Sequence, residues 1–122
     1  MVNATHPAQS GQVTREHIAQ IATHLFAQQG FNTTSIRDIA ETAGVTKPVL
    51  YYYFQSKENL FVSLIHEAYD FFYQKLEMIL NKPGDFWDHL REITQLYFDL
   101  GREFGDSIRL LYMAVSGPRR NT

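Results

Sequence analysis

The side chains best suited to chemistry gather in one short part of the chain. Lys47 and Tyr51 are four residues apart, so on a helix they share a face one turn in length. A lysine there can donate to O6 and N7 of guanine, and a tyrosine can pack against a thymine methyl or bond a phosphate. Lys57 lies at an expected helix start, where the helix N-terminus already favours an anion. These side chains are able to contact duplex DNA if the surrounding helices leave them on a free surface.

Catalysis and metal binding have no comparable support in the sequence. His17 and His24 are seven residues apart on one expected helix and lack a third ligand, while His66 and Glu67 are adjacent and face different ways. The sequence contains no nucleophile elbow, no glycine-rich phosphate loop and no spaced catalytic pair. We therefore expect no enzymatic activity, no metal and no cofactor.

Composition and charge narrow the class of protein further. Of the 122 residues, 44% are hydrophobic and 20% are charged, as in an ordinary soluble globular protein. No apolar run reaches the roughly 18 to 20 residues of a membrane span. The chain contains no cysteine, which excludes disulfides and thiolate metal sites. The N-terminal residues show no apolar signal segment, and both observations fit a cytoplasmic protein.

The charge balance limits how the chain can bind nucleic acid. The net charge is −2, and residues 1–60 carry as many basic as acidic side chains. Because no basic stripe exists, any DNA binding must depend on a few well-placed contacts and on helix N-termini rather than on a broad positive field.

The element that precedes these side chains is expected to be a helix. Residues 1–13 lack periodicity and are expected to form a loose tail. From Thr14, which can cap the helix, apolar side chains recur at helical spacing. Gly30 ends the pattern, because glycine adopts the left-handed cap conformation at little cost.

A second and a third helix are expected to follow, joined by a tight turn. Ser35 and Asp38 have the spacing of a capping box, and Gly44 is the expected left-handed end of the second helix. Thr46 is expected to cap the third helix, whose first turn tolerates Pro48. Two short helices around a glycine-centred turn make a helix-turn-helix. The side chains off the core side of its third helix are Lys47, Pro48, Val49, Tyr51 and Tyr52.

Three further helices are expected after the helix-turn-helix. Ser56 caps a long fourth helix that residues 81–84 interrupt, Asp85 starts a fifth, and Gly105 precedes a sixth. The side chains expected to face inward from the fifth helix are Phe86, Leu90, Ile93, Tyr97, Leu100 and Phe104.

The chain is rich in aromatic residues beyond residue 68. For each of them alone, helix core is the favoured interpretation. An apolar effector pocket between helices is the other interpretation, because such pockets are mostly aromatic. The candidates for this pocket are Trp87, Tyr97, Phe98, Tyr112 and Met113.

The stretch from Thr33 to Leu60 resembles the signature of TetR-family transcriptional regulators. It reads TTSIRDIAETAGVTKPVLYYYFQSKENL, and its lead-in from Ala27 to Phe31 is similar to the family as well. The specific resemblance covers about residues 14–65, and the remaining helices agree only in layout.

The resemblance implies an all-α fold. A three-helix, homeodomain-like helix-turn-helix bundle would be followed by a helical ligand-binding and dimerisation domain, here incomplete. The corresponding parts are a tail (1–13), the DNA-binding domain (14–56) and the first helices of the regulatory domain (57–122).

The resemblance also implies roles for individual residues. The third helix would read the major groove, while Tyr53, Lys57 and the hydroxyl-rich start of the second helix would touch phosphate. Where relatives often carry Ser or Thr this chain has Val49, so a thymine methyl becomes the expected contact. The expected DNA-contacting set is Thr33, Thr34, Ser35, Thr46, Lys47, Pro48, Val49, Tyr51, Tyr52, Tyr53 and Lys57.

Partners and a mechanism follow from the same resemblance. A member would be a ligand-responsive repressor that binds a palindromic operator as a homodimer, with no role at a membrane. A small-molecule effector would shift the fourth helix and so change the spacing of the two reading heads. The pocket and interface of such regulators need further helices, so we expect this chain to be part of a longer one. One alternative stays open: the balanced charge of residues 1–60 also fits a helical small-molecule-binding or dimerisation module that no longer reads DNA.

Overall fold

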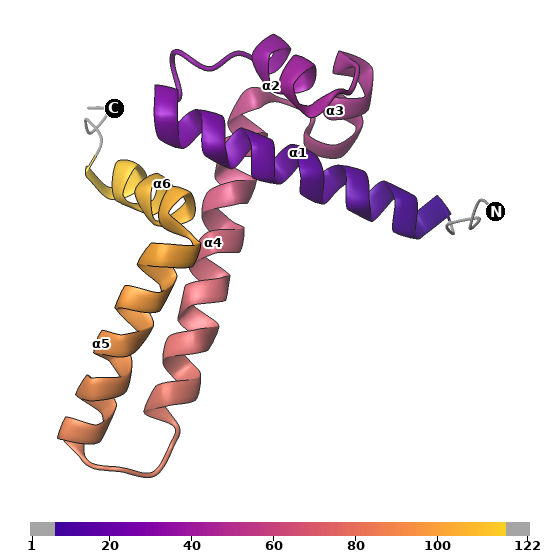
Figure 1. The fold of residues 1–122 in the computed structure, drawn as a ribbon. Coiled ribbons are helices and arrows are strands. Elements are labelled where there is room, and N and C mark those ends of the chain that lie inside the picture. The colour runs from indigo at the N-terminus through magenta and orange to yellow at the C-terminus, as the bar shows by residue number, and fades with distance from the viewer. Residues whose placement is uncertain (1–6, 117–122) are drawn as a thin grey trace, which may run out of the picture. The chain divides into compact units, whose positions relative to one another are not determined.

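The computed structural model describes residues 7–116, and every regular element in that range is a helix (Figure 1). This confirms the predicted all-α fold. The chain divides into two compact units, residues 1–63 and 64–122, and the fourth helix begins in one and continues into the other. The helices are α1 (Pro7–Gln29), α2 (Ile36–Ala43), α3 (Lys47–Phe54), α4 (Lys57–Leu80), α5 (Phe86–Glu103) and α6 (Gly105–Ser116).

The core of the first unit lies between α1, α2 and α3, with the start of α4. Ile18, Ala22 and Phe26 recur every fourth residue on α1 and have no exposed surface, so they form one apolar stripe. Leu50 from α3 and Leu60 from α4 are equally buried. The other buried apolar side chains of this core are Ala27, Ile39, Ala40, Ala43 and Phe54.

Both ends of α2 have the caps that the sequence predicted. The Ser35 hydroxyl accepts a hydrogen bond from the Asp38 N–H at 3.0 Å, and the Asp38 carboxylate accepts one from the Ser35 N–H at 3.2 Å. Gly44 has φ 71° and ψ 29°, and its N–H and that of Val45 donate to carbonyls of the last turn of α2. These local bonds fix the angle at which the chain turns into α3.

The junction between α3 and α4 consists of two residues, Gln55 and Ser56. Gln55 has φ 67° and ψ −42°, and the Ser56 N–H donates to the Phe54 carbonyl at 2.7 Å. This is a γ-turn with a positive central φ, a conformation that is rare and strained outside glycine. Ser56 then accepts a hydrogen bond from the Asn59 N–H at 3.0 Å and so caps α4 as predicted. The link between α3 and α4 is therefore short and tightly bonded.

The first helix is longer than the sequence predicted. It begins at Pro7 rather than Thr14, so residues 7–13 are helical and not part of a loose tail. Residues 1–6 lie outside the described residues. The extension has a packing partner that periodicity alone does not reveal, because a Cβ placed on Gly11 would lie 3.2 Å from the Tyr53 hydroxyl oxygen on α3. Once a helix is nucleated, adding such residues costs little.

In the second unit, α5 runs antiparallel beside the distal part of α4 (Figure 1). Asp85 caps α5 in a reciprocal capping box with Asp88. Lys82 in the connecting loop forms an ion pair with Glu92 at 3.2 Å, and its carbonyl is 2.9 Å from Nε2 of His89. These bonds hold the loop against the first turns of α5.

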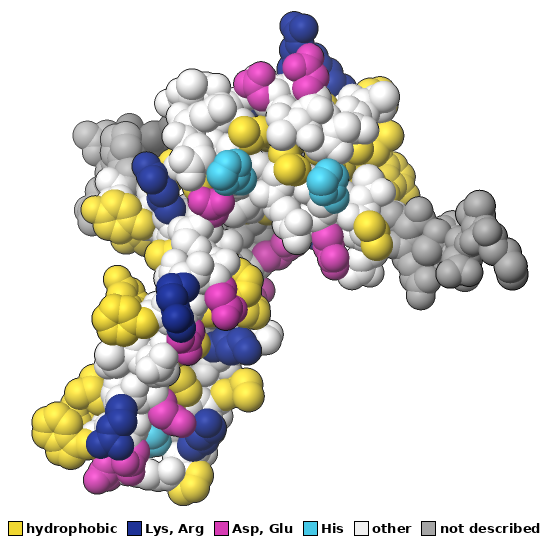
Figure 2. Space-filling view, viewed as in Figure 1, with side chains coloured by type: hydrophobic (Ala, Val, Ile, Leu, Met, Phe, Trp, Pro, Cys, Tyr) yellow, Lys and Arg dark blue, Asp and Glu magenta, His cyan; other side chains and the backbone are white. Residues whose placement is uncertain are grey.

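The predicted inward face of α5 is largely exposed. Phe86 and Tyr97 are each 68% exposed, and α5 has no fully buried residue. Figure 2 shows hydrophobic side chains standing on the surface over α5. The prediction that the aromatic residues beyond residue 68 belong to a core is therefore wrong for most of α5. Periodicity identifies the side chains that share a face, but the described helices leave much of that face uncovered.

Candidate nucleic-acid interface

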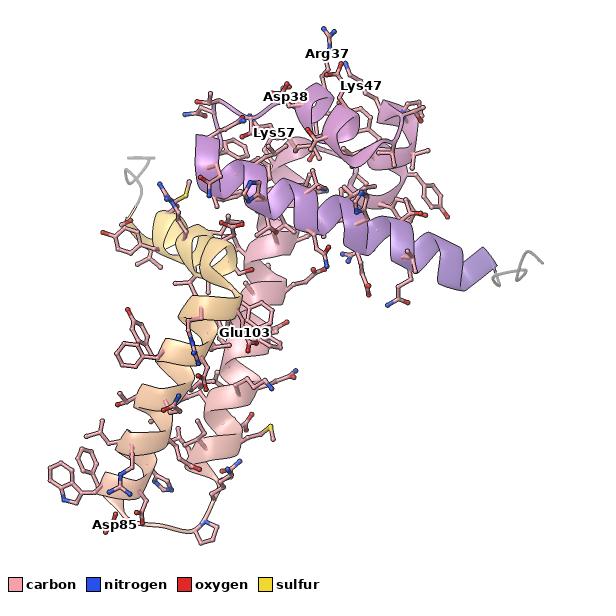
Figure 3. The ribbon with its side chains drawn as sticks, viewed as in Figure 1. Arg37, Asp38, Lys47, Lys57, Asp85 and Glu103 are labelled. Carbon is pink, nitrogen blue, oxygen red and sulfur yellow. The ribbon has the colours of Figure 1, made fainter. Side chains whose placement is uncertain are left out.

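One face of α3 points away from the core of the first unit. Lys47, Pro48, Val49, Tyr51 and Tyr52 are exposed, as the sequence predicted, while Leu50 and Phe54 anchor the opposite face. Figure 3 shows Lys47 projecting from the N-terminal end of α3. A helix with an open N-terminal end and donors on its free face has the dimensions that the major groove admits.

Tyr53 is the third residue of the tyrosine run and lies differently from the other two. Its side chain is half-buried, its ring meets the Tyr52 ring edge-on at 5.1 Å, and its hydroxyl lies against Gly11 of α1. Tyr53 therefore joins α3 to the N-terminal part of α1. Its hydroxyl retains the ability to bond a phosphate, which stays a prediction.

The hydroxyl residues before α2 differ in their surroundings. Thr33 and Ser35 are exposed, although Ser35 also serves the capping box. Thr34 has no exposed surface, and its hydroxyl donates to the Gly30 carbonyl at 2.8 Å. The expectation that the Thr34 side chain contacts DNA is therefore wrong, because that hydroxyl holds the turn between α1 and α2 instead.

Thr46 occupies the N-cap position of α3, but its side chain makes no capping hydrogen bond. The predicted position is confirmed and the predicted cap bond is not. Because Thr46 is exposed at a helix N-terminus, its hydroxyl can donate a hydrogen bond to an acceptor on another molecule.

Lys57 is held in place by an aromatic cluster. Its ammonium nitrogen lies 4.2 Å from the centroid of the Phe31 ring. Phe31 stacks on Phe26 at 5.8 Å, and both rings meet Phe61 at 5.1–5.2 Å. The Lys57 charge is thus fixed beside the N-terminus of α4, where an anion would meet both the ammonium and the helix dipole.

Arg37 is a basic side chain outside the set expected to contact DNA. Its Nε donates to Glu41 at 3.0 Å, and this hydrogen bond, with the negative charge of Glu41, raises the pKa of Arg37 above its ordinary value. The signal in the sequence was the pair of opposite charges four residues apart on α2. A groove of about 310 Å³ between α2 and α3 is lined by Arg37, Ala40, Glu41, Val45 and Lys47.

The five candidates for an effector pocket are mostly exposed in the described part of the chain, and their role stays a prediction. Trp87, Tyr97, Phe98 and Tyr112 are 62–70% exposed, and Met113 is half-buried. Trp87 packs against Phe86 at the start of α5, whereas Tyr97 and Phe98 pair near its middle. Trp87, Tyr97 and Phe98 therefore stand in exposed aromatic pairs on α5.

Residues 7–116 offer neither a metal site nor a membrane-crossing helix. No cluster of three or more carboxylate, imidazole or thiol side chains suited to a metal ion occurs there. Within the same range, no helix combines the length and the apolar character that a membrane crossing needs.

A segment within the first two thirds of the chain matches a known family model. Residues 18–64 match the family described as bacterial regulatory proteins, tetR family. This range contains α2, α3 and the start of α4, together with the C-terminal half of α1.

Several curated proteins are similar to this chain. The HTH-type transcriptional regulator AcrR of Shigella flexneri is 42% identical over 87 residues, which cover 70% of this chain and 40% of AcrR. The HTH-type transcriptional regulator RutR of Escherichia coli K12 is 32% identical over 101 residues, covering 83% of this chain and 47% of RutR. The chain therefore spans less than half the length of these relatives.

Solved structures share the arrangement of helices. A gamma-butyrolactone receptor (ArpA-like protein) aligns with a TM-score of 0.79 and 25% identity, over 93% of this chain and 59% of the receptor. A TetR-like transcriptional regulator from Rhodococcus sp. RHA1 aligns with a TM-score of 0.77 and 26% identity, over 84% of this chain and 58% of that protein.

Proposed function

Because the chain belongs to the TetR family of bacterial regulatory proteins, we propose that it is a sequence-specific, DNA-binding transcriptional regulator and a ligand-responsive repressor. The observation that carries the proposal is the exposed face of α3, which presents Lys47, Val49 and Tyr51 while Leu50 and Phe54 are buried behind it. A side chain used only for packing would not stand on that face.

The proposed contacts divide between bases and backbone. Lys47 donates to guanine, Val49 packs against a thymine methyl, and Tyr51, Tyr52 and Pro48 complete the surface in the major groove. Phosphates on either side meet the hydroxyls of Thr33, Ser35, Thr46 and Tyr53 and the ammonium of Lys57. Thr34 is left out of this set because its hydroxyl is buried.

The proposal includes a partner chain and an effector. Two copies would bind a palindromic operator in the cytoplasm, with α3 of each copy in successive major grooves. Support for a small-molecule effector comes from the gamma-butyrolactone receptor, which shares this arrangement of helices. An effector bound among the regulatory helices would move α4 and, through the short Gln55 turn, the reading helix.

Selection of duplexes from a randomised pool, followed by titration at several salt concentrations, tests the proposal. The protein should recover one palindromic sequence and bind it about 10³-fold or more tightly than random duplex. A second candidate, a helical binding or dimerisation module that does not read DNA, is favoured by the equal numbers of basic and acidic residues in the first unit. Absence of binding to any duplex would refute the first candidate and leave the second, which ligand binding or self-association would then have to demonstrate.

A further inference from the structure

Two basic side chains from different helices meet at the groove between α2 and α3. Arg37 and Glu41 line it from α2 and Lys47 lines it from α3. Figure 3 shows Arg37 and Lys47 projecting in the same direction from the tip of the first unit. The exposed face of α3 therefore continues onto α2, with Arg37 as its neighbouring cation.

The bond between Arg37 and Glu41 has a specific geometry. It uses Nε of the guanidinium, at 3.0 Å from one carboxylate oxygen, and the terminal nitrogens of Arg37 have no partner within the described part of the chain. A guanidinium is planar and rigid, so a bond at Nε orients its two terminal nitrogens outward as a fork. That fork matches O6 and N7 of guanine or two oxygens of a phosphate.

Glu41 would be costly at a surface that only gripped phosphate. Its side chain is 65% exposed beside Arg37, and a carboxylate there repels the DNA backbone and cancels one of the four basic charges of the first unit. Such a cost is consistent with a role in orientation, since an arginine with a fixed fork discriminates between bases better than one that turns freely.

We propose that Glu41 is a positioning residue that fixes Arg37 as a second base-reading side chain, on α2, beside Lys47. The inference rests on the proposed function, because it assigns base reading to a residue outside the reading helix. In this proposal Arg37 binds the edge of a guanine in the major groove, next to the base pair that Lys47 reads.

Binding titrations with two duplexes test the proposal: one selected from a random pool by the wild-type protein, and the same duplex scrambled. Arg37→Lys keeps the charge and loses the fork, so the affinity ratio of selected to scrambled duplex should fall about 5- to 150-fold with the salt dependence unchanged. Glu41→Ala should lower the ratio on the order of threefold or more, without weakening binding to the scrambled duplex. Glu41→Gln should keep most of the ratio, because its amide oxygen still accepts from Nε.

Two controls separate positioning from charge. Glu16→Ala removes an exposed carboxylate of the same unit that bonds Gln12, and it should leave the ratio unchanged. In an Arg37→Lys background, Glu41→Ala should lower the ratio no further, because Glu41 acts through the Arg37 fork.

Three results have distinct meanings. If Glu41→Ala behaved as Glu16→Ala does, Glu41 would be a surface acid and the proposal would be overturned. If Arg37→Lys kept the full ratio, Arg37 would not read bases and the proposal would fail as well. If the wild-type protein preferred no duplex, the proposed function itself would be refuted, which the first titration reveals before any variant is made.

Discussion

At the scale of single residues, Lys47 is the side chain on which the proposed base reading most depends. It is exposed at the first position of α3 and lines the groove next to Arg37. Lys47→Ala should cost about 1–3 kcal/mol of binding free energy on the selected duplex and much less on random duplex. Paired titrations at one salt concentration measure both. Equal losses on the two duplexes would make Lys47 a backbone contact, and an unchanged melting temperature serves as the control for folding.

Lys57 should behave in the opposite way. Lys57→Ala should weaken binding to all duplexes alike and reduce the slope of log affinity against log salt by about one unit, because one phosphate contact is removed. Lys75→Ala is a matched control, since Lys75 also lies over a phenylalanine ring, Phe71, but in the second unit. Identical salt slopes for wild type and Lys57→Ala would leave Lys57 with only its contact to Phe31.

The sequence alone predicted which side chains of α3 are exposed, but it did not predict every residue of the candidate interface. Leu50 and Phe54 lie on the apolar stripe of a short helix, so the exposure of Lys47 follows from helical geometry. Thr34 was misassigned because a hydroxyl before a helix suits either a phosphate or a carbonyl, and only the path of the turn brings it to Gly30. The fixed orientation of Arg37 depends on rotamers that spacing does not determine.

At the scale of elements, the turn between α2 and α3 depends on Gly44. With φ at 71°, a β-branched residue there is strained, so Gly44→Val should lower the unfolding free energy by more than about 1 kcal/mol. Thermal or urea denaturation measures the loss. Gly101→Ala is the matched control: Gly101 lies within α5, has no close neighbour and no positive φ, and should be neutral or stabilising. A wild-type midpoint for Gly44→Val would contradict the left-handed conformation.

Helix ends proved easier to predict than helix surroundings, for a physical reason. The caps at Ser35, Gly44 and Ser56 are hydrogen bonds between residues a few positions apart, so the short sequence around each helix end is enough to predict them. The start of α1 at Pro7 involves a contact between Gly11 and Tyr53, far apart in the chain. What covers a helix face is likewise a long-range property, which explains why the exposure of α5 was not predicted.

At the scale of the whole molecule, charge sets the salt dependence of binding. The first unit has four basic residues, Arg15, Arg37, Lys47 and Lys57. If each of these residues neutralised one phosphate, the slope of log affinity against log salt would be about −3.6 for each chain bound to DNA. We do not expect a steeper slope. Dissociation constants between about 50 and 200 mM salt measure it. A much steeper value would require contacts from basic residues of the second unit, such as Arg91 or Arg109.

If the chain reads an operator as proposed, the equal numbers of cations and carboxylates in the first unit also affect how the protein distributes within a genome. A chromosome offers about 10⁶–10⁹ decoy sites, and the sequence-independent grip of lysine and arginine decides how many copies those decoys hold. Here Glu16, Asp38, Glu41 and Glu58 offset the four basic residues, so decoys would retain a regulator of the proposed kind weakly through this unit. More copies would then remain free in solution, and fewer molecules per cell would be needed to occupy the operator. The same balance would make the search proceed by diffusion through solvent more than by sliding along the duplex.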